Sequence, residues 1–205
     1  MSTPTSFSIK SSIFDRAREL VLDQEYLTFD NKDKIGVPPA LIKTQDIVAF
    51  RFGIKWINGY SFVIGRIYCI DILSSSGEII KLRLKSVYRV NLDQLSKKYS
   101  AIIQALYIIY FDNLVDKYLK MHTTSQEFSI LGVIFNQDGI ILNGNNYIHW
   151  EDIGTRSYNT YYAVFSKSNP NIYKAFEYLN DWNAGIMYSV SREILKGMNL
   201  YAEQP

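Results

Sequence analysis

The hydrophobic residues in the segment 92–121 recur at spacings of three and four, which is the period of one face of a helix. No Gly or Pro interrupts the segment, so the pattern predicts one long helix. Between Ala101 and Phe111 the apolar residues go nearly all the way round, as in a helix that is covered on more than one side. This apolar stretch is too short to cross a membrane. We therefore expect protein on both sides of the helix.

The pattern before this helix is typical of β-structure. Runs rich in β-branched and aromatic residues predict strands at 25–30, 46–57, 60–73 and 78–87. The pair Asn58-Gly59 between two of these runs is typical of a two-residue hairpin turn. The first twelve residues are rich in Ser and Thr, which indicates loose order, and the segment 13–22 fits either a short helix or a strand.

After the helix, the strand pattern begins again. It predicts strands at 128–135, 140–142, 147–153, 161–166 and 186–190, and a strand or a helix at 172–179. A short helix is expected at 191–198, with Ser191 as its cap. The long helix thus separates two sheet-rich halves, and we expect one unit at 1–121 and a second at 122–205.

The two halves are similar when the chain is shifted by 106 residues. The shift pairs Phe29 with Phe135, Ile35 with Ile141, Ile42 with Ile148, and Asp46-Ile47 with Asp152-Ile153. The order of the predicted elements repeats as well, which favours a duplicated unit. Two unrelated β segments would be the alternative.

A meander of strands closed by a C-terminal helix, in units of about 100 residues, resembles the pleckstrin-homology-like (PH-like) domains of bacteria. The segments that carry the resemblance are YLTF, DIVAFRFG, NGYSFVIGRIYCIDI and GEIIKLRL, followed by GVIF, HWEDI and YYAVFSK in the second half. The family fold is a bent seven-stranded sandwich that a helix plugs at one end. Eukaryotic members bind phosphoinositides through basic residues of the first strand and loop. Here that loop, 30–34, has charges that nearly cancel, so lipid binding is not carried over.

The resemblance implies an α+β fold, in which an antiparallel PH-like meander or sandwich with one long central helix precedes a smaller β-rich PH-like unit. The second unit departs from the family pattern, because its final helix is expected to be very short. We expect this abbreviated unit to use the far end of the long helix as its cover.

Composition narrows the class of protein. The chain has 205 residues with 47% hydrophobic residues, enough to bury a core, and its formal charge of +2 argues against nucleic acid or an anionic membrane as the obvious partner. A lone cysteine, Cys69, excludes an intramolecular disulfide and a multi-cysteine zinc site, and is expected to be a buried, inert thiol. The N-terminus lacks the apolar core of a signal peptide and no long apolar run exists, so we expect a soluble, cytoplasmic protein without a cofactor.

Catalytic chemistry has only weak candidates. His149 and Glu151 would share one face of a strand, as a general base and the carboxylate that orients it. A strand end with polar residues facing water is the alternative. His122 closes the long helix, where a cation suits the helix dipole. None of the common motifs of zinc, nucleotide or hydrolase sites occurs.

Two sets of residues are candidates for binding. Lys81, Arg83 and Lys85 alternate on one face of a strand and form a basic stripe that can meet anions. The second half is rich in aromatic residues of the kinds found at interaction hot spots, although they are also ordinary core residues. The set consists of Tyr147, Trp150, Tyr158, Tyr161, Tyr162, Trp182 and Tyr188.

These observations predict a non-catalytic binding or scaffold protein whose partner is a protein or a peptide. A peripheral binder of anions or phospholipid headgroups through the basic stripe is the second hypothesis. A hydrolase or transferase that uses His149 and Glu151 is the third.

Overall fold

The computed structural model describes residues 4–10, 16–30 and 38–201. The chain divides into two compact units, unit 1 at Met1–Asp112 and unit 2 at Asn113–Pro205. The division lies inside the long helical segment. The sequence pattern predicts it after Met121, at the end of that segment. The predicted α+β class is confirmed, because antiparallel sheets and helices make up the described residues.

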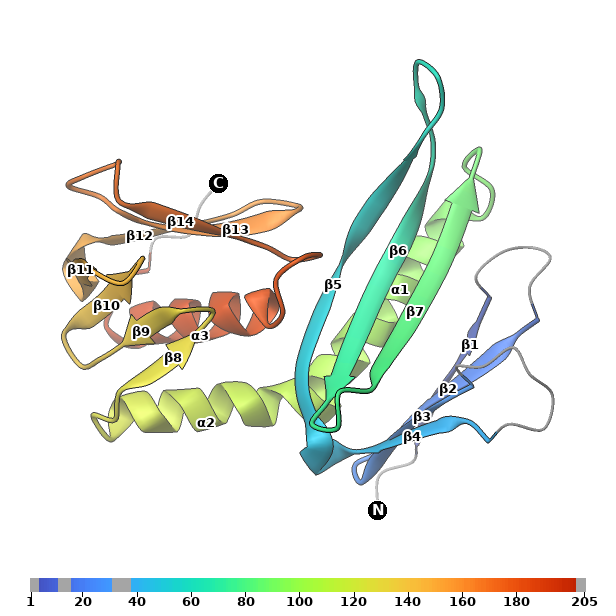
Figure 1. Cartoon of the computed structure of the whole chain (residues 1–205), viewed down its shortest axis with the longest axis horizontal. Helices are drawn as coiled ribbons and strands as arrows, with labels where there is room; N and C mark the ends of the chain where they lie inside the picture. The colour runs from blue at the N-terminus through green and yellow to red at the C-terminus, as the bar shows by residue number, and fades with distance from the viewer. Residues whose placement is uncertain (1–3, 11–15, 31–37, 202–205) are drawn as a thin grey trace. The chain divides into compact units, whose positions relative to one another are not determined.

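Unit 1 contains two antiparallel meanders and a helix (Figure 1). Strands β1 (Thr5–Ile9), β2 (Arg18–Leu22), β3 (Tyr26–Phe29) and β4 (Ala40–Lys43) pair in chain order. A single 3-10 turn, η1 (Thr44–Asp46), leads into the second meander of β5 (Ile47–Asn58), β6 (Val63–Ser74) and β7 (Ile79–Val87). Helix α1 (Leu92–Leu106) follows and packs on β6 and β7.

The core of unit 1 is formed by alternate residues of β7 and by a continuous buried run, Tyr68–Ile72, of β6. Ile70 and Ile72 of β6 and Leu82 of β7 point to the same side and are almost fully buried. Phe50 of β5 stacks on Phe111 with ring centroids 3.6 Å apart. Each such side chain, removed from water, contributes about 1.5–3 kcal/mol to the stability of the fold.

Unit 2 has the same kinds of element. Its first meander consists of β8 (Phe128–Ile130), β9 (Val133–Phe135), β10 (Gly139–Leu142) and β11 (Asn146–His149). A 3-10 turn, η3 (Trp150–Asp152), precedes β12 (Ile153–Ser157), β13 (Tyr161–Ser166) and β14 (Tyr173–Glu177). The unit ends with helix α3 (Ala184–Gly197).

The long helix has three parts. After α1, the five residues Tyr107–Phe111 form a π-helical turn, η2, and α2 (Asp112–Thr123) continues the helix. Leu106 and Phe111 are buried in unit 1, whereas Tyr118 packs on Phe128 of unit 2 with ring centroids 5.1 Å apart. The stretch from Ala101 to Phe111, which has apolar residues nearly all the way round the helix, ends with this π turn. A π turn adds a residue per turn and re-aims the side chains that follow it.

Several expectations about single elements are wrong. Thr5–Ile9 is strand β1, where loose order was expected. No two-residue turn forms at Asn58-Gly59, because Asn58 pairs with Val63 and the loop spans the residues between them. The expected strand 128–135 is a hairpin, since Leu131 and Gly132 both have positive φ (54° and 72°) and reverse the chain.

The expected strand 186–190 is also wrong, because these residues belong to α3. Ile186, Val190 and Ile194 are buried at a spacing of four, which is a helical period. Helix α3 has 14 residues, so the prediction of a very short final helix in unit 2 is wrong as well.

The order of elements is the same in the two units. Each has a four-stranded meander, one 3-10 turn, a three-stranded meander and a helix. Both helices follow an asparagine with positive φ, Asn91 at 54° and Asn183 at 66°.

Hydrogen bonds recur at corresponding positions of the first meanders. In the turn after the second strand, the Asp23 N–H donates to the carbonyl of Tyr26, and the Asn136 N–H to that of Gly139, both at 3.0 Å. In each turn the side-chain oxygen of the same residue accepts from the backbone N–H two residues on, at 3.0 and 3.1 Å. These are Asx-turns in equivalent places.

The second meanders share a further pattern. The Ser75 N–H donates to the carbonyl of Asp46 at 2.7 Å, and the Lys167 N–H donates to that of Asp152 at 2.8 Å. The serine hydroxyls on either side of each donor bond each other at 2.7 and 3.1 Å. In unit 2, hydrogen bonds from these serines also lower the pKa of Asp152.

The shift of 106 residues fits only part of this correspondence. It places the starts of β4, η1 and β5 on those of β11, η3 and β12, but β6, β7 and α1 no longer coincide with their counterparts. Before β4 it is wrong, because Phe29 ends the third strand of its sheet and Phe135 ends the second, so Leu142 holds the place of Phe29. The connection between β3 and β4 is longer than its counterpart, which a comparison without gaps misses. Ile35, paired with Ile141, lies outside the described residues.

Gly65 is required where β6 passes close to β7. A Cβ atom at this position would lie 2.3 Å from the carbonyl oxygen of Ser86. We expect Gly65→Ala to destabilise unit 1 by about 2 kcal/mol, since backbone must move to relieve the clash. Chemical denaturation measures the change, and an unchanged midpoint would contradict the close approach. Ser61→Ala, in the exposed loop between β5 and β6, is the control. Gly77→Ala is not suitable, because Gly77 has positive φ and alanine would be strained there.

Candidate functional site

The most exposed apolar side chain of unit 1, Tyr60, lies on the hairpin of β5 and β6. Both strands have 12 residues, whereas β7 has 9 and pairs with β6 only as far as Gly65 and Val87. The hairpin therefore extends beyond β7 and α1 (Figure 1). Tyr60 is fully exposed at its tip, and Phe62 is 65% exposed.

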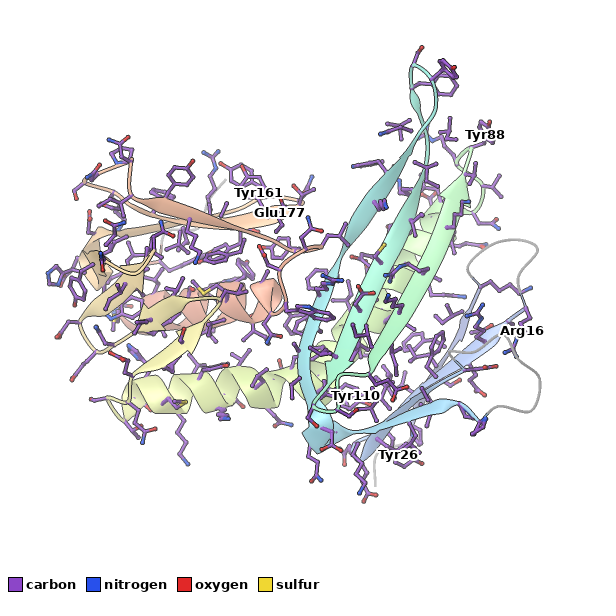
Figure 2. All side chains as sticks on the ribbon, viewed as in Figure 1. Arg16, Tyr26, Tyr88, Tyr110, Tyr161 and Glu177 are labelled. Atoms are coloured by element: carbon purple, nitrogen blue, oxygen red, sulfur yellow. The ribbon has the colours of Figure 1, made fainter. Side chains whose placement is uncertain are left out.

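The turn from β7 to α1 lies beside the base of this extension. The Tyr88 N–H donates to the carbonyl of Ile64 at 2.8 Å, and the Ser86 hydroxyl donates to that of Val90 at 2.9 Å. Tyr88 and Arg89 have positive φ (50° and 63°), an uncommon conformation for residues other than glycine that is typical of tight turns, and both are exposed. Tyr88 is 72% exposed, and Figure 2 shows it at the same end of unit 1 as the hairpin tip.

A cavity of about 260 Å³ separates the hairpin from this turn. Trp56, Arg66, Arg89 and Leu92 are among its lining residues. The guanidinium group of Arg66 lies 4.6 Å from the ring centroid of Trp56, in a cation–π contact. We call this end of unit 1 the distal surface. It consists of Trp56, Tyr60, Phe62, Val63, Arg66, Tyr88, Arg89 and Val90.

The charge of this region has one sign. The segments 47–70 and 79–92, which form β5, the distal part of β6, β7 and the turn, contain no Asp or Glu, and Asp71 of β6 lies just outside them. Lys55, Arg66, Lys85 and Arg89 lie within them. The formal charge of +2 for the whole chain therefore hides a basic aromatic region at one end of unit 1.

The basic stripe lies on the outward face of β7. Lys81 and Lys85 are exposed, as the alternating pattern predicts. Arg83 differs, because its guanidinium group lies 2.6 Å from Asp71 and donates to the carbonyl of Leu82 at 2.8 Å. The stripe therefore presents two lysines and one arginine that is held by a neighbouring strand.

Asp71 is the centre of a small charge cluster. It is 3% exposed, and the Arg51 Nε also donates to it at 3.0 Å. Asp71→Ala would leave two arginines without their carboxylate, so we expect a loss of about 2–3 kcal/mol, less than for a fully buried pair because each arginine is about a third exposed. Denaturation of the variant tests this. Glu78→Ala, at an exposed position, is the control, and equal losses in both variants would refute a special role for Asp71.

Cys69 lies beside this cluster and is buried, as the sequence predicts. Burial raises the pKa of its thiol, and the positive charge of Arg83 opposes the rise only in part. The thiol is therefore protonated at neutral pH.

The predicted aromatic set of unit 2 is divided by the structure. Trp150 and Tyr162 belong to the core, with 4% and 1% exposure, so the prediction that they bind a partner is wrong. The Trp150 Nε1 donates to the carbonyl of Gln137 at 3.0 Å, and the Tyr162 ring lies against that of Tyr188. Their place inside the sheets leaves no surface for a partner.

The rest of that set lies nearer the surface. Tyr147 and Tyr158 are exposed, and Tyr161 and Trp182 are half-buried. Tyr158 stacks on Tyr161 with ring centroids 4.4 Å apart, at the hairpin of β12 and β13. Figure 2 shows Tyr161 beside Glu177, its partner in the pairing of β13 and β14.

His149 and Glu151 do not form the expected dyad. His149 ends β11 and Glu151 lies in η3, so they do not share a strand face. They line an open hollow of about 540 Å³ with Asp138. In the residues that the structure describes, no hydrogen bond joins them, and the His149 ring meets the Tyr147 ring edge-on at 4.8 Å.

His122 lies in the last turn of α2, as expected, but its ring is half-buried. Its ring packs edge-on against Trp150, with centroids 5.3 Å apart, and burial lowers its pKa. The neutral imidazole is therefore favoured over the cation that a helix C-terminus prefers.

Residues 4–10, 16–30 and 38–201 contain neither a metal-ligand cluster nor a membrane-spanning helix. No three His, Cys, Asp or Glu side chains gather there in a way that could hold a metal ion. No helix of this part of the chain is long and apolar enough to cross a membrane.

Sequence reasoning missed the distal surface. It placed Tyr60 and Phe62 in the expected strand 60–73, although they lie in the loop that precedes β6. The available signal was the long run without acidic residues around an exposed hairpin. No family model matches the chain, and neither the curated proteins nor the solved structures include a significant match.

Proposed function

We propose that this chain is a non-catalytic binding protein made of two PH-like units, and that the distal surface of unit 1 is its binding surface. The shared order of elements supports the first part, since four strands, three strands and a closing helix are what the PH-like resemblance implies. The recurring Asx-turn and serine pair support a duplication. We place the protein in the cytoplasm.

The exposure of apolar residues on the distal surface supports the proposal that this surface binds a partner. Apolar side chains scattered singly on a surface are ordinary, but a contiguous exposed group marks an interaction site. Here Tyr60, Phe62 and Val63 are all more than half exposed on one short segment, and Tyr88 and Val90 lie on the turn nearby. Keeping these side chains in water has no benefit for folding, so an interaction explains them better than stability does.

A protein or peptide partner, expected from the sequence, remains a prediction for this surface. Trp, Tyr and Arg are the side chains most enriched at binding hot spots, and the cavity beside Trp56 and Arg66 is the size of one side chain. Anion binding at the basic stripe and catalysis at His149 and Glu151 are weaker alternatives, because Arg83 is engaged with Asp71 and the expected dyad is not formed.

Photo-crosslinking inside the cell tests the proposal without knowledge of the partner. A benzophenone amino acid replaces Phe62 in one variant and Tyr173, an exposed residue of β14 in unit 2, in another. We expect specific adducts, either with a protein or with lipid, from position 62 and none from position 173. Equal labelling at the two positions would contradict the proposal.

A further inference from the structure

The hairpin tip is a convex apolar projection. The loop between β5 and β6 is closed by one backbone hydrogen bond, from the Gly59 N–H to the carbonyl of Phe62 at 2.8 Å. Tyr60 at its apex is fully exposed, and Phe62 and Val63 are exposed beside it. A projection of this kind needs either a deep matching pocket or a medium that deforms around it. Tyr and Trp rings prefer the interface between water and lipid, because they are apolar with one polar end.

Cations outnumber acidic residues behind this tip. Arg66 and Arg89 line the cavity at its base, and Lys55 and Lys85 lie on the adjoining parts of β5 and β7. The first acidic residue beyond the turn is Asp93, which follows Leu92 directly and lines a second hollow with Arg89. Guanidinium groups form paired hydrogen bonds with phosphate oxygens, and each cation near an anionic lipid surface increases binding about fivefold.

The two features together match the requirement for reversible membrane attachment. One apolar insertion alone binds a bilayer only marginally, and a basic patch adds the second signal that stable attachment needs. A rigid protein pocket for Tyr60 and Phe62 would not require the absence of carboxylates from two whole segments of the chain. The basic aromatic composition is therefore explained better by a membrane than by a peptide.

We propose that the distal surface docks on an anionic membrane, with Tyr60, Phe62 and Val63 among the headgroups and Arg66 and Arg89 against lipid phosphates. This inference rests on the proposed function, because it names the partner of the same surface. The attachment is peripheral and reversible, and it does not use the loop 30–34 or the basic stripe as its centre.

Vesicle co-sedimentation of the full chain tests the inference. Vesicles of phosphatidylcholine with phosphatidylserine are compared with vesicles of phosphatidylcholine alone, at low and high salt. We expect binding to the anionic vesicles that weakens at high salt, because salt screens the charge contribution. Binding to the neutral vesicles should be more than about 25-fold weaker, because the two arginines of the distal surface and the lysines behind it lose their anionic partners.

Matched variants separate the two contributions. Tyr60→Ser with Phe62→Ser should reduce binding to anionic vesicles at least about tenfold, since both rings leave the interface. Arg66→Gln with Arg89→Gln should reduce it by about 25-fold and lower its salt dependence by about half, because Lys55 and Lys85 remain. Leu41→Ser with Lys43→Gln, at exposed positions of β4 in the same unit, is the control and should bind as the parent does.

The outcomes distinguish this inference from the proposed function. Wild-type protein that ignores anionic vesicles, or variants that bind as well as the parent, would overturn the membrane inference. If position 62 then crosslinks to a protein, the proposed function stands and the partner is a protein. If position 62 gives no adduct either, both proposals fail. The thermal midpoint of each variant must equal that of the parent, because all the changed side chains lie outside the core.

Discussion

Leu106→Asp is expected to unfold unit 1 and leave unit 2 folded. Leu106 is 1% exposed on α1, and a carboxylate there would be buried without a partner. We expect a loss of more than about 4 kcal/mol, which is most of the stability of a domain of this size. Hydrogen exchange should show β5, β6 and β7 losing protection while β13 and α3 keep theirs.

Two further variants make this prediction specific. Ile108→Asp lies in the same helical segment but at a position that is 64% exposed, so its effect should be small. Val115→Asp, at a buried position of α2, should loosen unit 2 and spare unit 1. If Leu106→Asp and Val115→Asp each unfold the whole chain, the division between Asp112 and Asn113 has no thermodynamic meaning.

Trp150→Ala is expected to destabilise unit 2 by about 3–5 kcal/mol. The indole is 4% exposed, contacts the rings of His122 and Phe135, and donates to the carbonyl of Gln137. Its loss leaves a cavity in the core and a turn without its donor. Chemical denaturation, monitored by the hydrogen exchange of β9 and β13, measures the change in the free energy of unfolding.

Trp150→Phe separates packing from hydrogen bonding at this position. Phenylalanine keeps most of the apolar volume and loses the donor, so the expected cost is about 1–2 kcal/mol. In unit 1 the side chain of Thr44 occupies the same place in η1 and donates to the carbonyl of Gln24 at 2.7 Å. If Trp150→Phe costs as much as Trp150→Ala, the hydrogen bond to the turn outweighs the packing.

Periodicity predicted those elements whose pattern ends at a clear boundary. Tyr161–Ser166 and the start of α1 at Leu92 agree with the expectation residue by residue. The segment 186–190 was misread because its β-branched residues favour a strand, while the spacing of four that continues to Ile194 was overlooked. The period of the wider window was the better guide.

The candidate surface could not be predicted from alternation. The pattern of Tyr60, Phe62 and Ile64 is that of a strand with one buried face, and nothing local shows that β7 ends before it reaches them. Burial depends on the length of the neighbouring strand, which is set far away in the chain. For the same reason Trp150 and Tyr162 were taken as binding candidates although sheet and helix cover them.

Hydrogen exchange of the full chain, with and without anionic vesicles, tests the central claim most directly. We predict slower exchange on vesicles in the segments 58–66 and 88–92, with the segment 136–151 around His149 and Glu151 unchanged. Slower exchange centred on 136–151, with the distal surface exchanging as fast as in free protein, would contradict the claim.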